Sequence, residues 1–356
     1  MGMLECYRGS DVFLTGHTGF KGGWLALWLA RLGARVTGYS LPAATDPCLF
    51  DVAQIGQTLH NQHFADIRDA SALTAAMQAA RPKFVFHLAA RPLVRQSYQT
   101  PLDTWSTNVM GCVHLLEAVR VCPSVRAVVV VTTDKCYDNH EWVWGYRETD
   151  PLGGHDPYSA SKAGAELVVS SYRKSFLAAS DQRIASARAG NVIGGGDWSE
   201  DRLIPDAVRA ITARHTLRIR NPGATRPWQH VLESLNGYLL LGARLVGEDG
   251  ARFADAFNFG PSAADNRTVS DVLQGLKMNL PGLSWELDGT SSTSQPHEAA
   301  FLYLDSSKST RSLGWKPRWD LDRALAETAR WYGSVQDKPA TARALCESQI
   351  EEFSAI

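Results

Sequence analysis

The first 190 residues alternate short apolar runs with longer stretches of helical periodicity, and this rhythm restricts the possible folds more than any other feature. Strand patterns that alternate with helical patterns are typical of βαβ units in a parallel sheet. We therefore expect an α/β protein with a Rossmann-type, doubly wound parallel sheet and a smaller mixed α/β lobe. The expected strands are 11–16, 35–40, 63–67, 84–90, 126–132 and 183–194. The expected helices are 20–32, which ends at Gly33, then 69–80, 101–121 and 157–178.

The rhythm breaks after residue 194, and this break suggests two parts. Residues 195–228 are rich in Gly, Asp, Arg and Pro, and 259–335 mixes short strands with helices. We expect a first domain over 1–190, completed by about 226–258. The second lobe would comprise 191–225 and 259–356.

Composition narrows the class of protein. The formal net charge of −1 argues against a dedicated nucleic-acid or membrane surface, and no apolar run reaches the roughly 18 residues of a spanning helix. The six cysteines form no CxxC pair and show no Cys/His metal spacing. We expect a small-molecule enzyme with reduced thiols in the cytoplasm and no metal site.

A glycine-rich loop follows the first expected strand directly. In "TGHTGFKGGW", Gly16, Gly19 and Gly22 have GxxGxxG spacing and lead into a helix. Such glycines let the backbone approach a pyrophosphate, and the helix N-terminus presents N–H groups to its charge. The position after a strand and before a helix predicts a dinucleotide site.

The residues that would select the cofactor are less typical. The second strand ends on Tyr39 and Ser40, where an acidic residue usually accepts the ribose hydroxyl, so this rule does not decide between NAD and NADP. Asp66 and Ile67 end the third expected strand, and Asp66 could bind the adenine edge or cap a helix. The small residues of "HLAAR", 87–91, leave room for the middle of a cofactor.

Tyr158 and Lys162 in "DPYSASKAGAE" stand four residues apart at a helix start, hence on one face. A nearby ammonium favours the phenolate, which could then take a proton from a hydroxyl group near neutral pH. Thr133 ends the fifth expected strand and would lie nearby. A YxxxK pair is common by chance, but together with the glycine loop it predicts hydride chemistry.

The fifth strand raises a question of its own, since "VVVVTTDKCYD" runs from buried residues straight into Asp134 and Lys135. Ligands of open parallel sheets bind beyond the carboxyl ends of the strands, where an acid next to an amine could serve acid–base catalysis. The alternative for Lys135 is a salt bridge to Asp134 or Glu148.

Several separate stretches resemble the extended short-chain dehydrogenases/reductases that act on nucleotide sugars, and within that group the CDP-glucose 4,6-dehydratases. The resemblance covers nearly the whole chain. Its motifs are "GHTGFKG", "TTDKCYDN", "YSASK", "RAGNVIGGGDW", "DRLIPD", "RPWQHV", "HEAAFLYLDSSK" and "LGWKPRWDLDRALAETARWY". It implies dehydration of CDP-glucose with NAD as an internal redox cofactor, as a step towards deoxysugars of bacterial surface polysaccharide such as O-antigen.

The resemblance also implies site residues. Thr133 would polarise the C4 oxygen, Asp134 would be the protonated acid and Lys135 the base, with Tyr158 and Lys162 as the oxidising pair. The implied cofactor residues are Gly16, Thr18, Gly19, Phe20, Lys21, Ser40, Asp66, Ile67, Leu88, Ala89, Ala90, Thr107, Tyr158, Lys162 and Val192. The implied substrate residues are Ser97, Asn191, Arg202, Leu203, Ile204, Arg220, Arg226, His230 and His297. Both histidines could equally be packing residues.

Other functions stay open at this point. A UDP-sugar 4-epimerase would use the same Thr, Tyr and Lys without elimination chemistry, and a dehydratase could act on another NDP-glucose. A non-catalytic NAD-sensing protein would typically lose part of the YxxxK pair, which is complete here. Related enzymes pair the helices that correspond to 101–121 and 157–178 into a four-helix bundle, which implies a homodimer or a tetramer.

Overall fold

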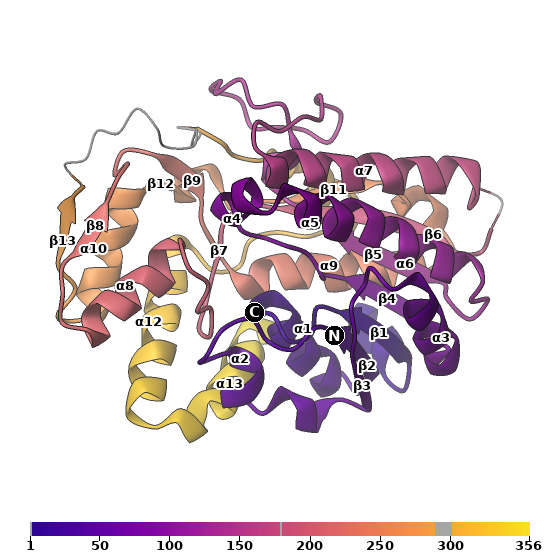
Figure 1. Ribbon diagram of the computed structural model, residues 1–356, viewed down its shortest axis with the longest axis horizontal. Coiled ribbons are helices and arrows are strands. Elements are labelled where there is room, and N and C mark those ends of the chain that lie inside the picture. Colours follow the sequence, from indigo (N-terminus) through magenta and orange to yellow (C-terminus); the bar gives the residue numbers. More distant parts are fainter. Residues whose placement is uncertain (1, 179, 289–300) are drawn as a thin grey trace.

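A seven-stranded parallel sheet forms the centre of the protein, which we describe from a computed structural model covering residues 2–178, 180–288 and 301–356 (Figure 1). The strand order is β11 (Ala256–Phe259), β6 (Arg183–Ala189), β5 (Ala127–Val131), β4 (Phe84–His87), β1 (Asp11–Thr15), β2 (Arg35–Ser40) and β3 (Asn61–Phe64). On one side of β1 the sheet continues with β2 and β3, and on the other side with β4, β5, β6 and β11. The order therefore reverses between β1 and β4, and ligands of doubly wound sheets bind beside such a point.

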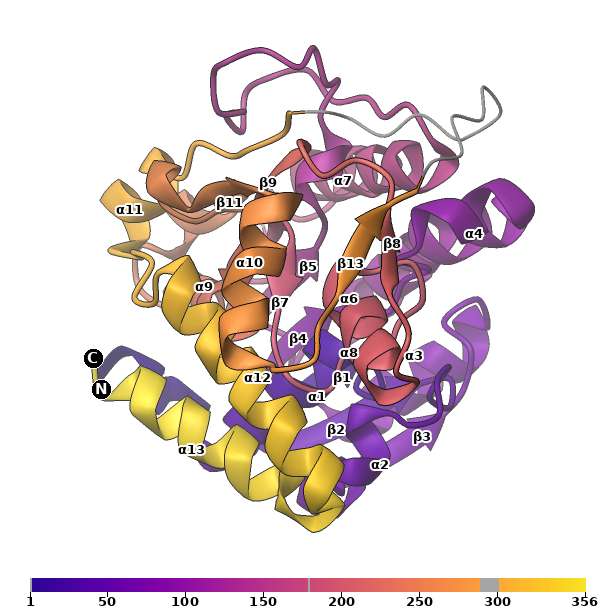
Figure 2. The ribbon, with the colours of Figure 1, turned by 90° about the vertical axis from the view of Figure 1, so that its left-hand side faces the viewer.

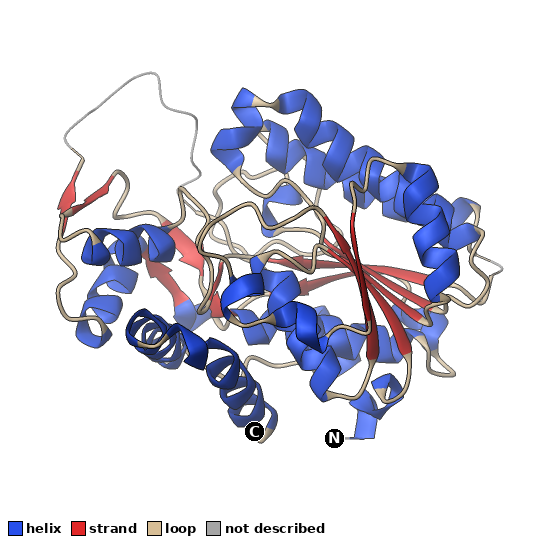
Figure 3. Ribbon diagram, turned by 60° about the horizontal axis from the view of Figure 1, so that its bottom comes forward, coloured by secondary structure: helices blue, strands red, loops and turns tan. Residues whose placement is uncertain are grey.

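Helices cover both faces of the sheet (Figure 3). One face carries α3 (Ala70–Ala80), α5 (Pro101–Trp105), α6 (Gly111–Arg120) and α7 (Pro157–Ser175), with the short α4 (Val94–Gln99) against α7. The other face carries α1 (Phe20–Arg31) and α9 (Val231–Leu245), with α2 (Leu49–Val52) and α11 (Ser307–Leu313) beside them. Because both faces are covered, central strands such as β5 are buried throughout and consist of apolar residues.

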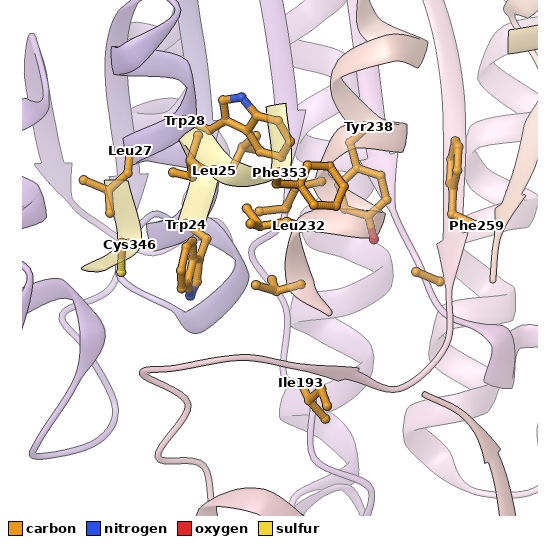
Figure 4. Close-up of a cluster of buried hydrophobic side chains, with 14 of the residues drawn as sticks. Trp24, Leu25, Leu27, Trp28, Ile193, Leu232, Tyr238, Phe259, Cys346 and Phe353 are labelled. Carbon is orange, nitrogen blue, oxygen red and sulfur yellow. The ribbon is translucent and has the colours of Figure 1, made fainter. Parts of the chain in front are cut away.

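The smaller lobe lies beyond the carboxyl ends of the strands (Figures 1 and 2). It contains the helices α8 (Leu203–Thr212), α10 (Val269–Asn279) and α12 (Leu321–Asp337). It also contains three pairs of short strands. These pairs are β7 (Val192–Ile193) and β10 (Gln229–His230), β8 (Leu217–Ile219) and β13 (Trp285–Leu287), and β9 (Thr225–Pro227) and β12 (Asn266–Thr268). The last helix, α13 (Ala342–Ser354), leaves the lobe and packs on α1. There the rings of Trp28 and Phe353 lie 5.7 Å apart in the larger core cluster (Figure 4).

The structure confirms the expected fold class and corrects several boundaries. The expected strand 183–194 is divided into β6 and β7, and β7 pairs with β10 outside the central sheet. The expected helix 101–121 is divided into α5, a π-helical turn at Ser106–Met110 and α6. The third strand ends at Phe64, so Asp66 lies beyond it. In the part of the chain covered by the structure, no helix is long and apolar enough to cross a membrane.

Candidate active site

A cavity of about 980 Å³ lies at the carboxyl ends of the strands, next to the reversal of strand order between β1 and β4. Its walls are the loop from β1 to α1, the ends of β4 and β5, the start of α7, and the lobe segments around 190–206 and 217–228. The cavity is large enough for two sizeable ligands side by side.

The glycine loop forms one end of this cavity. Gly16 has a φ of +79°, and a Cβ there would lie 2.7 Å from the backbone nitrogen of Ala89. A Cβ on Gly22 would overlap the carbonyl oxygen of Gly16. Gly19 is the N-cap of α1 and provides no side-chain cap, so the first-turn N–H groups are left for a ligand. This backbone cradle fits a pyrophosphate.

Every residue expected to bind the cofactor lines the cavity. They are Gly16, Thr18, Gly19, Phe20, Lys21, Ser40, Asp66, Ile67, Leu88, Ala89, Ala90, Thr107, Tyr158, Lys162 and Val192. They come from the ends of β1, β2, β3 and β4 and the segments that follow them, from the first turns of α7 and from β7.

At the end of β2, hydroxyl groups replace the usual acidic residue. Thr18 Oγ1 and Ser40 Oγ are 2.9 Å apart. The Asp66 carboxylate accepts Arg68 Nε at 2.9 Å and Nη2 at 2.7 Å, and these hydrogen bonds lower the pKa of Asp66. The alternative that Asp66 caps a helix is wrong, because Asp69 is the N-cap of α3.

The first turn of α7 presents Tyr158 and Lys162. The helix begins there because Asp156 caps it, accepting the Ser159 N–H at 2.9 Å. Ser97 Oγ accepts the Tyr158 N–H at 3.1 Å, and Lys162 Nζ donates to the Val131 carbonyl at 3.1 Å. Both side chains are mostly buried but reach the cavity.

Burial dominates the proton affinities of this pair. It raises the pKa of Tyr158 to about 12, although the Thr133 hydroxyl and the Arg202 charge act in the opposite direction. Burial also lowers the pKa of Lys162 to about 8. The expectation that Tyr158 would have a lowered pKa is therefore wrong for the protein alone, since desolvation of the phenolate outweighs its neighbours.

Thr133, Asp134 and Lys135 follow closely after the end of β5. Thr133 and Lys135 line the cavity. Asp134 is only 1% exposed and lies behind this wall, with Oδ1 accepting the Thr133 hydroxyl at 2.9 Å. Burial raises the pKa of Asp134, although the charge of Lys135 opposes this. Glu148, the other expected partner of Lys135, accepts the Asn258 N–H at 2.8 Å instead.

The opposite end of the cavity is formed by the lobe. Six of the expected substrate residues line it, namely Asn191, Arg202, Leu203, Ile204, Arg220 and Arg226. Arg202 Nη1 donates to Asp197 Oδ2 at 2.8 Å, which holds the arginine against the wall. The whole cavity is lined by seven arginines and three lysines but only six carboxylates, all from aspartates. This excess of positive charge suits a diphosphate.

Three expected substrate residues are placed differently. Ser97 lies behind the wall, where it holds the start of α7. His230 is buried with its ring 4.8 Å from that of Trp319, and its Nδ1 accepts the Leu232 N–H at 3.4 Å, so the packing alternative applies. His297 lies outside the described residues.

Sequence reasoning missed some residues of the cavity. Arg95 lines it and forms an ion pair of 3.3 Å with Asp201, which joins α4 to the segment before α8. No sequence pattern marks this residue, because it reaches the cavity through the packing of distant segments. Within the described ranges, no cluster of three or more His, Cys, Asp or Glu could hold a metal ion.

Comparisons with known proteins agree with this geometry. The family described as GDP-mannose 4,6 dehydratase matches residues 13–255. A CDP-glucose 4,6-dehydratase of Salmonella typhimurium is 50% identical over 333 residues, which cover 92% of this chain and 91% of that protein.

Solved structures share the fold at lower identity. A UDP-glucose-4-epimerase from Stenotrophomonas maltophila with bound NAD superposes with a TM-score of 0.78 at 21% identity, covering 92% of this chain and 99% of that one. An NAD-dependent NDP-hexosamine 5,6-dehydratase of tunicamycin biosynthesis gives a TM-score of 0.75 at 23% identity, covering 91% of this chain and 98% of that one.

Proposed function

Since the chain belongs to the GDP-mannose 4,6-dehydratase family, we propose that it dehydrates CDP-glucose to CDP-4-keto-6-deoxyglucose with NAD as internal redox cofactor. The observation that carries this proposal is the meeting of Thr133 and Lys135 with Tyr158 and Lys162 in one cavity that also contains the glycine loop. The 50% identity to a CDP-glucose 4,6-dehydratase supports the choice of substrate.

The glycine loop and the start of α1 would hold the pyrophosphate of NAD, and the wall from Ser40 to Ile67 its adenosine half. When bound, NAD supplies a hydride acceptor at C4 of the sugar and a hydride donor at C6. The two solved structures named above support the choice of NAD as cofactor. The epimerase contains bound NAD, and the 5,6-dehydratase depends on NAD. The reaction leaves no net reduced cofactor.

Tyr158 is the base for oxidation at C4, because its oxygen can take the proton of the C4 hydroxyl. The Thr133 hydroxyl, which donates to Asp134 Oδ1 in the structure, would turn to donate a hydrogen bond to the same oxygen. Burial raises the pKa of Tyr158 to about 12 even though the Thr133 hydroxyl and the Arg202 charge offset part of the cost of a buried phenolate. These groups together produce the 4-ketone.

Elimination then uses the two residues after Thr133. The ketone makes the C5 proton acidic, and the Lys135 amine takes it. Asp134 gives its proton to the C6 hydroxyl, which leaves as water. The buried Asp134 holds a proton more tightly than an ordinary carboxyl, as this role needs. Its carboxyl lies behind Thr133, so its side chain must turn towards the cavity to deliver the proton.

The lobe would hold the nucleotide. Arg202, Arg220 and Arg226 face the cavity, and planar guanidinium groups can bind the oxygens of a diphosphate in pairs. Asn191 and Val192 also line the cavity, and Asn191 and the backbone beside Val192 would contact the glucosyl unit and the nicotinamide carboxamide. We also propose that the chain divides near residue 191 into the first domain and the lobe. Helix α13 packs on α1 of the first domain. We also propose that the enzyme works in the cytoplasm.

A substrate panel tests this function. We expect incubation with CDP-, UDP-, dTDP- and GDP-glucose, each with NAD or with NADP, to give the alkali-detectable 4-keto product only with CDP-glucose and NAD. No reduced cofactor should accumulate. Build-up of NADH in proportion to turnover would indicate a simple dehydrogenase, and inversion at C4 without a keto product would indicate a 4-epimerase. Preference for another base would contradict the choice of CDP.

We further propose that two copies pair through α5, α6 and α7. Large apolar side chains project from these helices into solvent, among them Leu102, which is 85% exposed, and Leu167, which is 61% exposed. Trp105, Met110 and Phe176, on or next to the same helices, are exposed as well. Burial of this surface between two copies would remove apolar area that a monomer leaves in water.

Light scattering at micromolar concentration tests the pairing. We expect the wild type to be a dimer or a tetramer, and Leu167→Asp to shift it to monomers, because a charge would be buried in the interface. Leu287→Asp, which changes an exposed leucine of β13 in the lobe, is the matched control and should leave the assembly unchanged. A monomeric wild type would refute the proposal.

A further inference from the structure

Arg68 lies on the cavity wall directly after the residues proposed to hold the adenosine half of NAD. The wall continues from Asp66 and Ile67 to Arg68, which comes just before Asp69, the N-cap of α3. The Arg68 side chain is 42% exposed, so protein atoms do not cover it on every side. The roles proposed above leave this arginine without a function.

The guanidinium group of Arg68 is held by all three of its nitrogen atoms. Nε and Nη2 donate to Asp66 Oδ2 at 2.9 Å and 2.7 Å, and Nη1 donates to Asp103 Oδ1 of α5 at 3.0 Å. The Asp66 carboxylate is itself fixed, because its Oδ1 accepts the Arg68 backbone N–H at 2.8 Å. These bonds from two directions fix the plane of the guanidinium group.

This arrangement leaves the flat face of Arg68 as the part that a ligand can contact. The N–H donors of a guanidinium group lie around its edge, and here each corner of that edge is bonded to an aspartate. The face of such a group stacks well on flat rings.

The surroundings of Arg68 favour an uncharged ring over an anion. Arg91 also lines the cavity and pairs with Asp103 at 3.5 Å. The two arginines and the two aspartates together carry no net charge. A phosphate group would therefore find little attraction here, whereas stacking on a ring does not require a free positive charge.

We propose that Arg68 is a cofactor-binding residue whose guanidinium face stacks on the adenine ring of NAD, while Asp66 and Asp103 hold its plane. This inference rests on the proposed function, because it takes NAD as the cofactor. The glycine cradle would hold the pyrophosphate at the start of α1, and the adenosine half would extend from there over the ends of β2 and β3. Arg68 lies just beyond β3. The competing explanation is a solvated surface salt bridge, which would not affect cofactor binding.

The test is Arg68→Met, which keeps an unbranched stem and removes the planar group. We expect calorimetric titration with NAD to give a Kd about fivefold higher than for the wild type, as for the loss of one cation–π contact at a partly exposed site. ADP keeps the adenosine half of NAD and should lose affinity by the same factor. Unchanged NAD affinity, or a loss with NAD but not with ADP, would refute the proposal.

A second ligand distinguishes the face of the adenine ring from its edge. Nicotinamide hypoxanthine dinucleotide replaces the adenine amino group by oxygen and keeps a flat ring. Arg68→Met should weaken its binding by the same factor as that of NAD, because stacking does not involve the amino group. A loss confined to NAD would indicate a contact with the amino group and would contradict the stack.

Arg68→Lys separates the planar group from the charge. Lysine keeps the positive charge but has no flat face, so most of the loss seen with Arg68→Met should remain. Wild-type affinity in this variant would show that charge alone is sufficient, and would refute the proposal.

Arg35→Met is the matched control. Arg35 Nε and Nη2 donate to Asp11 at 2.7 Å and 2.5 Å, and its side chain is 48% exposed, but it does not line the cavity. Its removal should leave the affinity for NAD unchanged. An equal loss in this variant would mean that the effect does not arise at the adenine ring.

Failure of this inference and failure of the proposed function are distinguishable. NAD titration needs no nucleotide sugar, so it reports on Arg68 even if CDP-glucose is not turned over. A wild type that binds NAD as tightly as its Arg68 variants would refute only the role of Arg68. A wild type that binds no NAD would refute the proposed cofactor together with this inference.

Discussion

Lys135→Met is expected to lower the rate of water loss from CDP-glucose by roughly 10²–10⁴-fold, the range for removal of a positioned general base. Methionine keeps an unbranched stem of similar bulk and removes the amine. Thr133, Tyr158 and Lys162 are unchanged, so a small near-ultraviolet signal of reduced cofactor should persist when substrate is added. Exchange of the C5 proton with deuterated solvent should fall together with water loss.

Matched variants define what this result means. Lys316→Met makes the same chemical change at an exposed residue outside the cavity and should leave the rate unchanged. Asp134→Asn should slow departure of the C6 hydroxyl and preserve more of the C5 exchange. If Lys135→Met dehydrates CDP-glucose at nearly the wild-type rate, the base lies elsewhere, and His155 is the next candidate because it also lines the cavity.

Gly22→Ala should abolish cofactor binding and lower the stability of the protein without ligand. The added Cβ would overlap the carbonyl oxygen of Gly16, and backbone atoms cannot move aside as a side chain can. Overpacking of this kind costs about 3 kcal/mol, and here it would displace the loop that forms the pyrophosphate cradle. Thermal unfolding and NAD titration measure the two effects.

Gly19→Ala is the matched control for this loop. A Cβ at Gly19 would lie 3.4 Å from the same Gly16 oxygen, an ordinary contact, so the unfolding temperature without ligand should stay near that of the wild type. Any loss of NAD affinity in this variant would then report on the space that the cofactor needs. Equal destabilisation by both changes would contradict the packing argument.

The strongly buried elements were predictable from the sequence, and the edges were not. In β1, β2 and β5 the apolar run coincides with the strand because both faces are covered. Strand β3 has the sequence "NQHF" and is largely exposed at the edge of the sheet, so the apolar signal moved the expected strand towards residue 67. The π-helical turn at Ser106–Met110 has no sequence signature.

The same distinction applies to the site. Local motifs correctly placed the glycine loop and the YxxxK pair on the cavity wall, because a strand, a turn and a helix start set their geometry. The depth of a side chain depends on distant packing, and for this reason Asp134, Ser97 and His230 proved to lie behind the wall. The nearness of Arg68 to Asp66 was visible in the sequence, but its second partner Asp103 comes from α5.

The last helices also affect when this site can form during synthesis. Trp331 of α12 fills the space where Gly195 lacks a side chain, and the Tyr332 hydroxyl donates to the Asp197 carbonyl, so both support the cavity wall that holds Arg202. Both residues follow all seven strands of the central sheet along the chain. The parallel sheet can assemble once its strands have been synthesised, but the wall proposed to bind the diphosphate is completed only after α12 has been synthesised. A nascent chain would therefore gain the cofactor cradle before it gains the substrate site.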